Sequence, residues 1–286
     1  MQVALAINAA MLVAAVVGGL LTGSLALLAD AGHVLSDVGA IGLGLGAAAL
    51  ASRSGGPRST FGLQRSEVLA ALVNGLALIV IAVLVAVAAV GRLSDPPEVE
   101  GAGVLALGLF GLAGNAAATF VLARGDRGDV NLEGVLRHSL ADALGSIAVV
   151  ASGAVILATG WLEADAVASL VVAVLILLAS VRLVMEPVGV LMESAPAGLD
   201  VDELGRTLLE IKGVREVHEL HVWTVTTGFV ALSAHVVIAP GSDRDLARRE
   251  LEYLLRERYG IAHTTLQMEE EAEEGALLQV GRPDRP

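Results

Sequence analysis

Two pairs of residues in this sequence each combine an imidazole with a carboxylate at the same spacing. Asp37 follows His33 by four residues, and Asp142 follows His138 by four. On a helix this spacing places both side chains of a pair on one face, about 6 Å apart along the axis. Two imidazoles and two carboxylates form a tetrahedral set of nitrogen and oxygen ligands that suits Zn2+, and the same ligand types also accept Co2+, Fe2+ or Mn2+.

Both pairs lie inside long apolar segments, where a charged group is unfavourable unless it has a partner. An ionised side chain at the centre of a bilayer costs about 2.5 to 3.5 kcal/mol. Two carboxylates neutralise a divalent cation, so a metal shared by the four residues relieves this cost. The competing interpretation is that His33 and His138 are interior histidines hydrogen-bonded to nearby carboxylates. For Asp30, one turn before His33, four roles stay open: a ligand, a partner of a ligand, a proton relay or an interfacial residue.

The composition indicates a membrane protein. Of the 286 residues, 55% are hydrophobic and only 17% are charged, and the mean hydropathy is +0.73. Soluble domains carry about 25% charged residues, so a soluble globule, a disordered chain and a coiled coil are disfavoured. The net charge of -13 argues against nucleic-acid binding, which requires an excess of Lys and Arg. The absence of Cys from the sequence excludes disulfides, thiolate metal sites and cysteine nucleophiles.

Six apolar segments are long enough to cross a bilayer as helices, which takes about 20 residues each. They cover residues 3–21, 26–51, 67–91, 101–123, 132–159 and 164–185. We therefore predict a transmembrane domain of six helices over residues 1–193. Asn74 and Asn115 fall within these spans, where we expect each amide to form a hydrogen bond between helices.

The arginines predict the orientation of this domain. The loops after spans two and four and their edges are basic, whereas the alternate loops hold only Arg92; the basic residues are Arg53, Arg58, Arg65, Arg124, Arg127 and Arg137. Because basic loops stay in the cytoplasm, both termini are expected there. The loops on the other side are acidic, with Asp95, Glu98, Glu100, Glu163 and Asp165.

The composition changes to a soluble pattern after Pro196. The predicted elements are a helix over 200–212, strands over 214–226 and 228–238, a helix over 242–259 and a strand over 262–269. This order indicates a small α+β domain over residues 194–269, with its helices on one face of the sheet. The acidic tail, residues 270–286, is expected to be disordered.

A hairpin turn centred on Thr226 and Thr227 would bring two histidines together. With this turn, His218 on the first strand would face His235 on the second, with their side chains about 5 Å apart. His221 would point to the other face of the sheet. A shift of the turn by one residue would undo this pairing.

Four motifs occur in order along the chain: LADAGHVLSD over 28–37, TFGLQRSE over 60–67, HSLADALGS over 138–146 and HELHVW over 218–223. They closely resemble the cation diffusion facilitator family in its zinc-transporting branch, and the similarity extends from about residue 5 to residue 269. The resemblance implies an α-helical membrane protein with six transmembrane helices and a C-terminal α+β ferredoxin-like cytoplasmic domain. It further implies a homodimer in the lipid bilayer, expected in the bacterial inner membrane, that exchanges Zn2+ for H+.

The resemblance also assigns metal ligands. The family's transport site maps onto His33, Asp37, His138 and Asp142, and a His at the first position is associated in the family with a preference for zinc over cadmium. A possible cytoplasmic site maps onto His218, His235 and Glu269 and, in some relatives, His263. Some relatives have a further His where this chain has Gln267. The equal alternative is that these histidines belong to the surface or to a dimer interface.

These observations predict a secondary active transporter and not an enzyme. The expected mechanism is efflux of a divalent cation, Zn2+ first among Cd2+, Co2+, Fe2+ and Mn2+, by proton antiport with alternating access. One alternative is an intramembrane metal-dependent hydrolase, although the sequence has no His-Glu-x-x-His segment. Another is a metal-independent exporter of small cations in which the His and Asp pairs only relay protons. A third is a metal sensor with a membrane anchor.

Overall fold

The computed structural model describes residues 2–53, 55–123 and 132–270, and the side chains of these residues except at 2–8, 37, 118, 121–123 and 132–141. The chain divides into two compact units, residues 1–188 and 189–286, and each is described by itself. Most of the predicted acidic tail, from residue 271 onward, lies outside the described residues.

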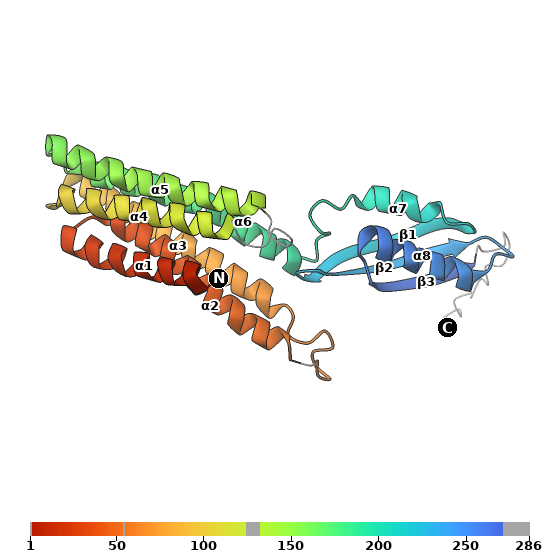
Figure 1. Cartoon of the computed structure of the whole chain (residues 1–286). Coiled ribbons are helices and arrows are strands. Elements are labelled where there is room, and N and C mark those ends of the chain that lie inside the picture. Colours follow the sequence, from red (N-terminus) through yellow and green to blue (C-terminus); the bar gives the residue numbers. More distant parts are fainter. Residues whose placement is uncertain (1, 54, 124–131, 271–286) are drawn as a thin grey trace, which may run out of the picture. The chain divides into compact units, whose positions relative to one another are not determined.

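The first unit consists of six long helices (Figure 1). They are α1 (Gln2–Thr22), α2 (Leu25–Ala51), α3 (Ser66–Ser94), α4 (Gly101–Ala123), α5 (Leu132–Thr159) and α6 (Glu163–Leu191). Each begins at or one residue before its predicted start, and α6 continues past the predicted residue 185 to Leu191. Among the described residues, α2, α3, α6 and the Asp142–Thr159 part of α5 are long and apolar enough to cross a membrane; the described apolar stretches of α1 and α4 are shorter.

Small residues allow α4 and α5 to approach closely. A Cβ atom added to Gly153 of α5 would lie 2.5 Å from the backbone nitrogen of Leu105 in α4. One added to Gly101 of α4 would lie 2.9 Å from the backbone nitrogen of Leu157 in α5. Such contact between backbones is typical of membrane helices, which gain packing energy where side chains are small. The position of α5, which carries His138 and Asp142, therefore depends on α4.

The two intramembrane asparagines form the interhelical hydrogen bonds predicted for them. Ser36 of α2 donates a hydrogen bond of 3.0 Å to Asn74 Oδ1 of α3. Asn115 Nδ2 of α4 donates one of 3.1 Å to Ser146 Oγ of α5. Both predictions are confirmed.

Two buried apolar clusters pack the helices together. One joins α2, α4, α5 and α6 near the start of α2 and contains Ala26, Leu27, Val99, Val104, Val149, Ile156, Ala164 and Ala168. The other joins α2, α3 and α6 and contains Ala29, Leu78, Ala82, Val85, Val172, Ala173 and Ile176. The residues that α2 contributes to both clusters lie in its first part. In contrast, residues 41–50 of α2 are exposed except at Ala47.

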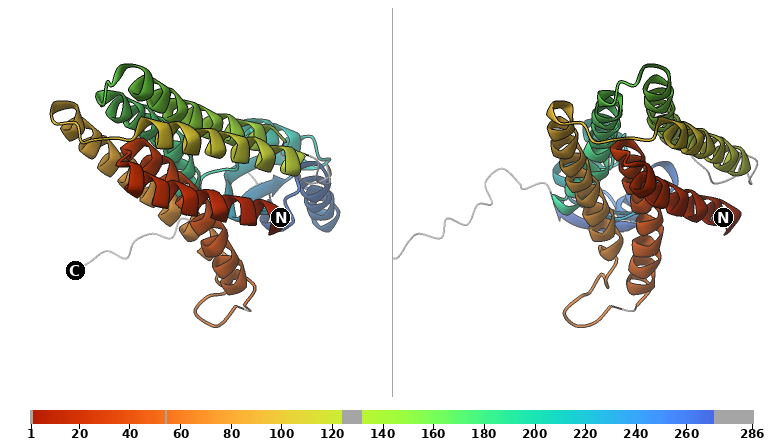
Figure 2. Two further views of the ribbon diagram at one scale, coloured as in Figure 1. Left: turned by 60° about the vertical axis from the view of Figure 1, so that its left-hand side comes forward. Right: turned by 90° about the vertical axis from the view of Figure 1, so that its left-hand side faces the viewer.

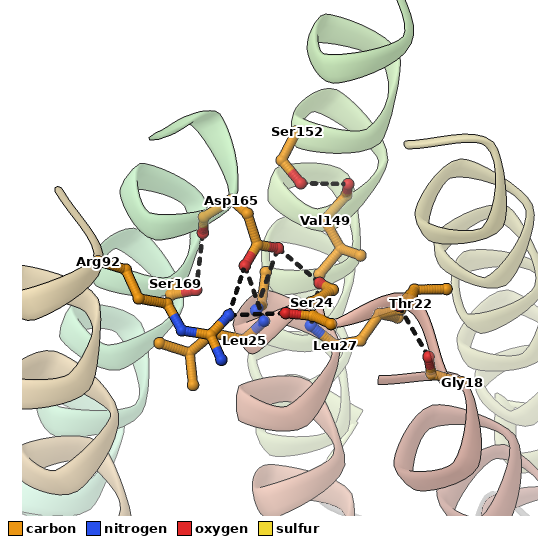
Figure 3. A network of polar contacts seen from close by, with 12 residues as sticks. Gly18, Thr22, Ser24, Leu25, Leu27, Arg92, Val149, Ser152, Asp165 and Ser169 are labelled. Carbon is orange, nitrogen blue, oxygen red and sulfur yellow. Dashed lines mark hydrogen bonds and ion pairs between the residues drawn. The ribbon is translucent and has the colours of Figure 1, made fainter. Parts of the chain in front are cut away.

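A polar cluster joins α2, α3 and α6 where α2 begins; we call Ser24, Leu25, Arg92 and Asp165 the Asp165 cluster (Figure 3). Asp165, in the first turn of α6, is 1% exposed. Its carboxylate accepts hydrogen bonds from Ser24 Oγ at 2.5 Å and from the Leu25 N–H at 2.7 Å. Arg92 Nη1, from the last turn of α3, lies 3.7 Å from Asp165 Oδ2, the oxygen atom that accepts from Leu25.

The prediction that Asp165 belongs to an acidic outward loop is therefore wrong. Its carboxylate is buried because it meets the N-terminus of α2, whose first N–H groups have no acceptor within the helix. The same end of a helix carries a partial positive charge that favours an anion. Arg92 supplies a full positive charge and also donates a hydrogen bond of 2.7 Å to the Gly23 carbonyl.

The second unit has the predicted order of helices and strands. Its elements are α7 (Val201–Leu209), β1 (Val214–Thr226), β2 (Phe229–Ile238), α8 (Arg244–Tyr259) and β3 (His263–Glu270). The sheet order is β1-β2-β3, with β2 antiparallel to β1 and parallel to β3. Buried residues of both helices, among them Leu204, Leu208, Leu251 and Leu255, pack against Val222, Leu232, Ala234 and Val236 of the sheet. Both helices thus cover one face of the sheet and leave the other open.

The hairpin reaches the predicted histidine pairing by a different register. Thr226 pairs with Phe229, so the turn lies one residue later than expected. Irregularities between Thr224 and Thr226 and between His218 and His221 then shift the register back, and His218 pairs with His235. The second irregularity is a bulge in which Glu219 has a φ angle of 48°.

The same bulge overturns the expectation for His221. That residue pairs with Ser233, two residues before His235 on a regular strand, so both pairs lie on one face of the sheet. His221 therefore lies on the same open face as His218. The extra residue in the bulge reverses the alternation on which the expectation was based.

Candidate metal sites

The first candidate site lies between α2 and α5. His33 Nε2 of α2 is 2.8 Å from Asp142 Oδ1 of α5, so two residues that are 109 positions apart in the sequence are in direct contact. The two side chains are only 14% and 17% exposed. A histidine from one predicted pair therefore meets the carboxylate of the other pair, as a site shared by the two helices requires.

The other two predicted ligands are Asp37 and His138, and their side chains lie outside the described residues. Their backbone positions belong to α2 and α5. Each is four residues from a member of the described contact and so falls on the same helix face as that member.

Asp30 lies at the same place. It is 9% exposed, and it lines one pocket together with His33, Asp142 and Gly145. A Cβ atom added to Gly145 of α5 would lie 3.7 Å from Asp30 Oδ1, so the Asp30 carboxylate lies directly against α5. The sequence left the role of Asp30 open, although its spacing of three residues from His33 already placed both on one helix face.

This site has the donors that a divalent transition metal needs. Imidazole nitrogen and carboxylate oxygen are both zinc ligands, and carboxylates balance the charge of the ion in an apolar environment. The pocket wall formed by α6 is apolar and consists of Val172, Leu175, Ile176 and Ala179. Such a wall limits access of water and so strengthens the interaction between the ion and its ligands.

A second candidate site lies on the open face of the small sheet. Nitrogen atoms of His218 and His235 and a carboxylate oxygen of Glu269 all lie within 4.8 Å of one another. His235 Nδ1 is 2.8 Å from Glu269 Oε1, and His218 Nε2 is 3.3 Å from Glu269 Oε2. The register places these side chains on three adjacent strands, because Glu269 faces Val237, two residues beyond His235.

Gln267 contacts the carboxylate of this second site. Its amide Nε2 donates a hydrogen bond of 2.7 Å to Glu269 Oε1. This hydrogen bond, with smaller contributions from His218 and His235, lowers the pKa of Glu269 below its usual value. Because metal ligands must be deprotonated, a lowered pKa favours metal binding.

The structure does not bring His263 to this cluster. His263 pairs with Ala231, four residues from Gln267 along β3, and its ring stacks edge-on against Phe229 with centroids 5.4 Å apart. Glu219, to which the sequence assigned no role, lies beside the cluster, with Oε2 3.5 Å from His235 Nε2. Sequence reasoning missed Glu219 because its proximity depends on the bulge.

Comparison with known families matches both units. Residues 1–192 match the family model described as the cation efflux transmembrane domain. Residues 196–271 match the model described as the cation efflux protein, cytoplasmic domain.

Curated relatives are similar over most of the chain. The Cadmium, cobalt and zinc/H(+)-K(+) antiporter of Bacillus subtilis is 38% identical over 90% of this chain and 84% of its own. The Zinc transporter ZitB of Escherichia coli is 39% identical over 93% of this chain and 85% of its own. The metal cation efflux system protein CzcD of Cupriavidus metallidurans is 34% identical over 94% of this chain and 85% of its own.

Proposed function

The chain belongs to the cation efflux family, and from this premise we propose that it exports Zn2+ across a membrane in exchange for protons. The family is one of membrane transporters, so the chain is a transporter and not an enzyme, and the hydrolase alternative falls away. Relatives named as zinc transporters or as antiporters of cadmium, cobalt and zinc support the choice of zinc as cargo.

The contact between His33 and Asp142 carries this proposal. It joins an imidazole and a carboxylate from two helices at 2.8 Å, in a partly buried pocket. We infer that Asp37 and His138 complete the site, so that two nitrogens and two oxygens surround the ion. Asp30 lines the same pocket, and we assign it to accepting or relaying protons during exchange.

The chemistry of these ligands explains the coupling to protons. Imidazole must be neutral and carboxylate ionised to bind the ion, so loading Zn2+ releases protons and protonation expels it. Histidine is the natural carrier of this exchange near neutral pH, because its usual pKa is about 6.5. The empty, protonated site would face outward, return to the cytoplasmic side and exchange its protons for Zn2+.

We further propose that the protein works as a homodimer in the bacterial inner membrane with both termini in the cytoplasm. The arginine distribution supports this orientation. His218, His235 and Glu269 would bind Zn2+ as a regulatory ligand in the cytoplasmic domain, with two nitrogens and a carboxylate oxygen as donors.

Zinc uptake into inverted membrane vesicles with an imposed pH gradient tests the proposal. Wild-type vesicles should accumulate Zn2+, and Asp142→Ala should reduce the initial rate at least about tenfold through loss of an anionic ligand. Asp95→Ala, the same change at an exposed residue after α3, is the matched control and should keep the wild-type rate. Transport by Asp142→Ala at the control rate would refute the site.

Equilibrium dialysis separates this function from a metal-independent proton relay. We expect the double variant His33→Ala with His138→Ala to lose about one bound Zn2+ per protomer. Unchanged Zn2+ binding in that variant would favour the relay.

A further inference from the structure

The Asp165 cluster closes one end of the helix bundle, and the candidate transport site lies beyond it. Leu25 begins α2, and His33 follows after eight residues, about 12 Å along the helix. Between them, Leu27 is 2% exposed and packs in the apolar cluster that joins α2, α4, α5 and α6. Buried apolar side chains therefore lie between this end of α2 and His33.

The opposite end of α2 is packed quite differently. A Cβ atom added to Gly39, Gly42, Gly44 or Gly46 would meet no other atom within 4 Å. Both views of Figure 2 show this end of α2 extending away from α4 and α5. Where α2 begins, it is tightly joined to α4, α5 and α6. Its other end lies apart from α4 and α5 and stays joined to α3, whose Ser66 Oγ donates a hydrogen bond of 2.9 Å to the Ala47 carbonyl. This arrangement is expected of a transporter whose site is closed toward one side.

The polar contacts between α2 and α6 at the closed end are centred on one carboxylate. Asp165 accepts from Ser24 Oγ and from the N–H of Leu25, and Ser24 in turn accepts a hydrogen bond from the N–H of Leu27 (Figure 3). Moving α2 away from α6 would leave a buried carboxylate without these donors, which is costly in an apolar environment. The cluster therefore stabilises the closed arrangement against an arrangement open at this end.

We propose that Asp165 is a positioning residue that controls access to the transport site: its contacts with α2 form when the site is closed at this end and break when it opens there. The inference rests on the alternating-access function proposed above. Weakening the cluster shifts the population toward the state that is open at this end, because only the closed state makes these contacts.

A single cysteine can report this shift, because the chain contains no other cysteine. The test uses full-length Leu27→Cys protein in lipid nanodiscs and measures the rate of its modification by a charged maleimide. Adding Asp165→Asn should increase the rate at least about threefold. Adding Glu163→Gln, which removes a carboxylate from the same first turn of α6, is the matched control and should leave the rate unchanged.

The alternative is that Asp165 only stabilises the fold. In that case Asp165→Asn lowers the melting temperature and leaves the labelling rate at the control value, and this result would overturn the proposal. If Asp165→Asn does not yield folded protein by size-exclusion chromatography, Arg92→Gln replaces it. This variant keeps the carboxylate and its donors, and we expect labelling at least about twofold faster; an unchanged rate would again overturn the proposal.

The labelling is measured without zinc and without a pH gradient. A failure of zinc transport in the vesicle assay would therefore refute the proposed function and leave the labelling result intact. A failure of Asp165→Asn to change labelling, with zinc transport present in the wild type, would refute only the role of Asp165.

Discussion

Adding one methyl group at Gly153 should separate α5 from α4. The Cβ atom of Gly153→Ala would lie 2.5 Å from the Leu105 nitrogen, 2.9 Å from the Leu105 Cα and 3.1 Å from the Gly101 carbonyl oxygen. All three are atoms of the α4 backbone, so no side chain can turn away to make room. The helices must move apart, and overpacking of this kind costs about 1 to 3 kcal/mol.

Gly42→Ala is the matched control, because it is the same substitution in a helix of the same unit and its Cβ atom would meet nothing within 4 Å. Both variants gain the same helix propensity, up to about 1 kcal/mol, and this gain cancels when they are compared. The difference in unfolding free energy should therefore be the steric cost alone, about 1 to 3 kcal/mol, with Gly153→Ala the less stable. Denaturant titration of both proteins in the same detergent measures it. Equal stability, or a more stable Gly153→Ala, would refute the close contact between α4 and α5.

Three further predictions concern the small domain. Saturating Zn2+ should raise the melting temperature of the metal-free chain, because the ion binds the folded state. His235→Ala should remove part of this rise, whereas His263→Ala, which lies outside the cluster, should not. If both variants reduced the rise equally, the site formed by His218, His235 and Glu269 would be contradicted. Because the folded-state pKa of Glu269 is lowered, its contribution to stability is present above the unfolded pKa and lost as pH falls through the folded pKa. In chelator, Gln267→Ala should therefore be less stable than wild type above the unfolded pKa and lose less stability on acidification, so that the two profiles converge at low pH; parallel or superimposable pH profiles would contradict the role of Gln267. Glu219 has a left-handed backbone angle that glycine adopts without strain. Glu219→Gly should therefore unfold at the same denaturant concentration as wild type or at a slightly higher one. A clear loss of stability would show that the Glu219 side chain matters more than the backbone strain.

The helix and strand pattern could be predicted closely because it depends on local features. The lengths of the apolar segments predicted all six helices, and β-branched runs around a glycine predicted the hairpin. The meeting of His33 with Asp142 could be anticipated only as a hypothesis from matching spacings, since 109 residues separate the two. The resemblance to a known family independently assigns the same four residues to one site.

Features that depend on tertiary contacts could not be predicted. An acidic residue at the start of a span looks the same in sequence whether it faces water or, as Asp165 does, a helix terminus 140 residues away. His221 was misplaced because alternation along a strand assumes that no residue is inserted, and nothing in the sequence marks the Glu219 bulge. His263 has the right residue type for a ligand, but the parallel register of β3 places it beside Ala231.

The bulge at Glu219 also bears on how the hairpin can change during evolution. Two irregularities in β1 each absorb one residue between the turn and the paired histidines. An insertion or deletion near the turn can thus be compensated by gaining or losing a bulge, while His218 and His235 remain opposite each other. Homologous hairpins that differ in length by a residue are therefore expected to preserve this pair, and alignments of them should place the gap between the turn and His218 and not at the histidines.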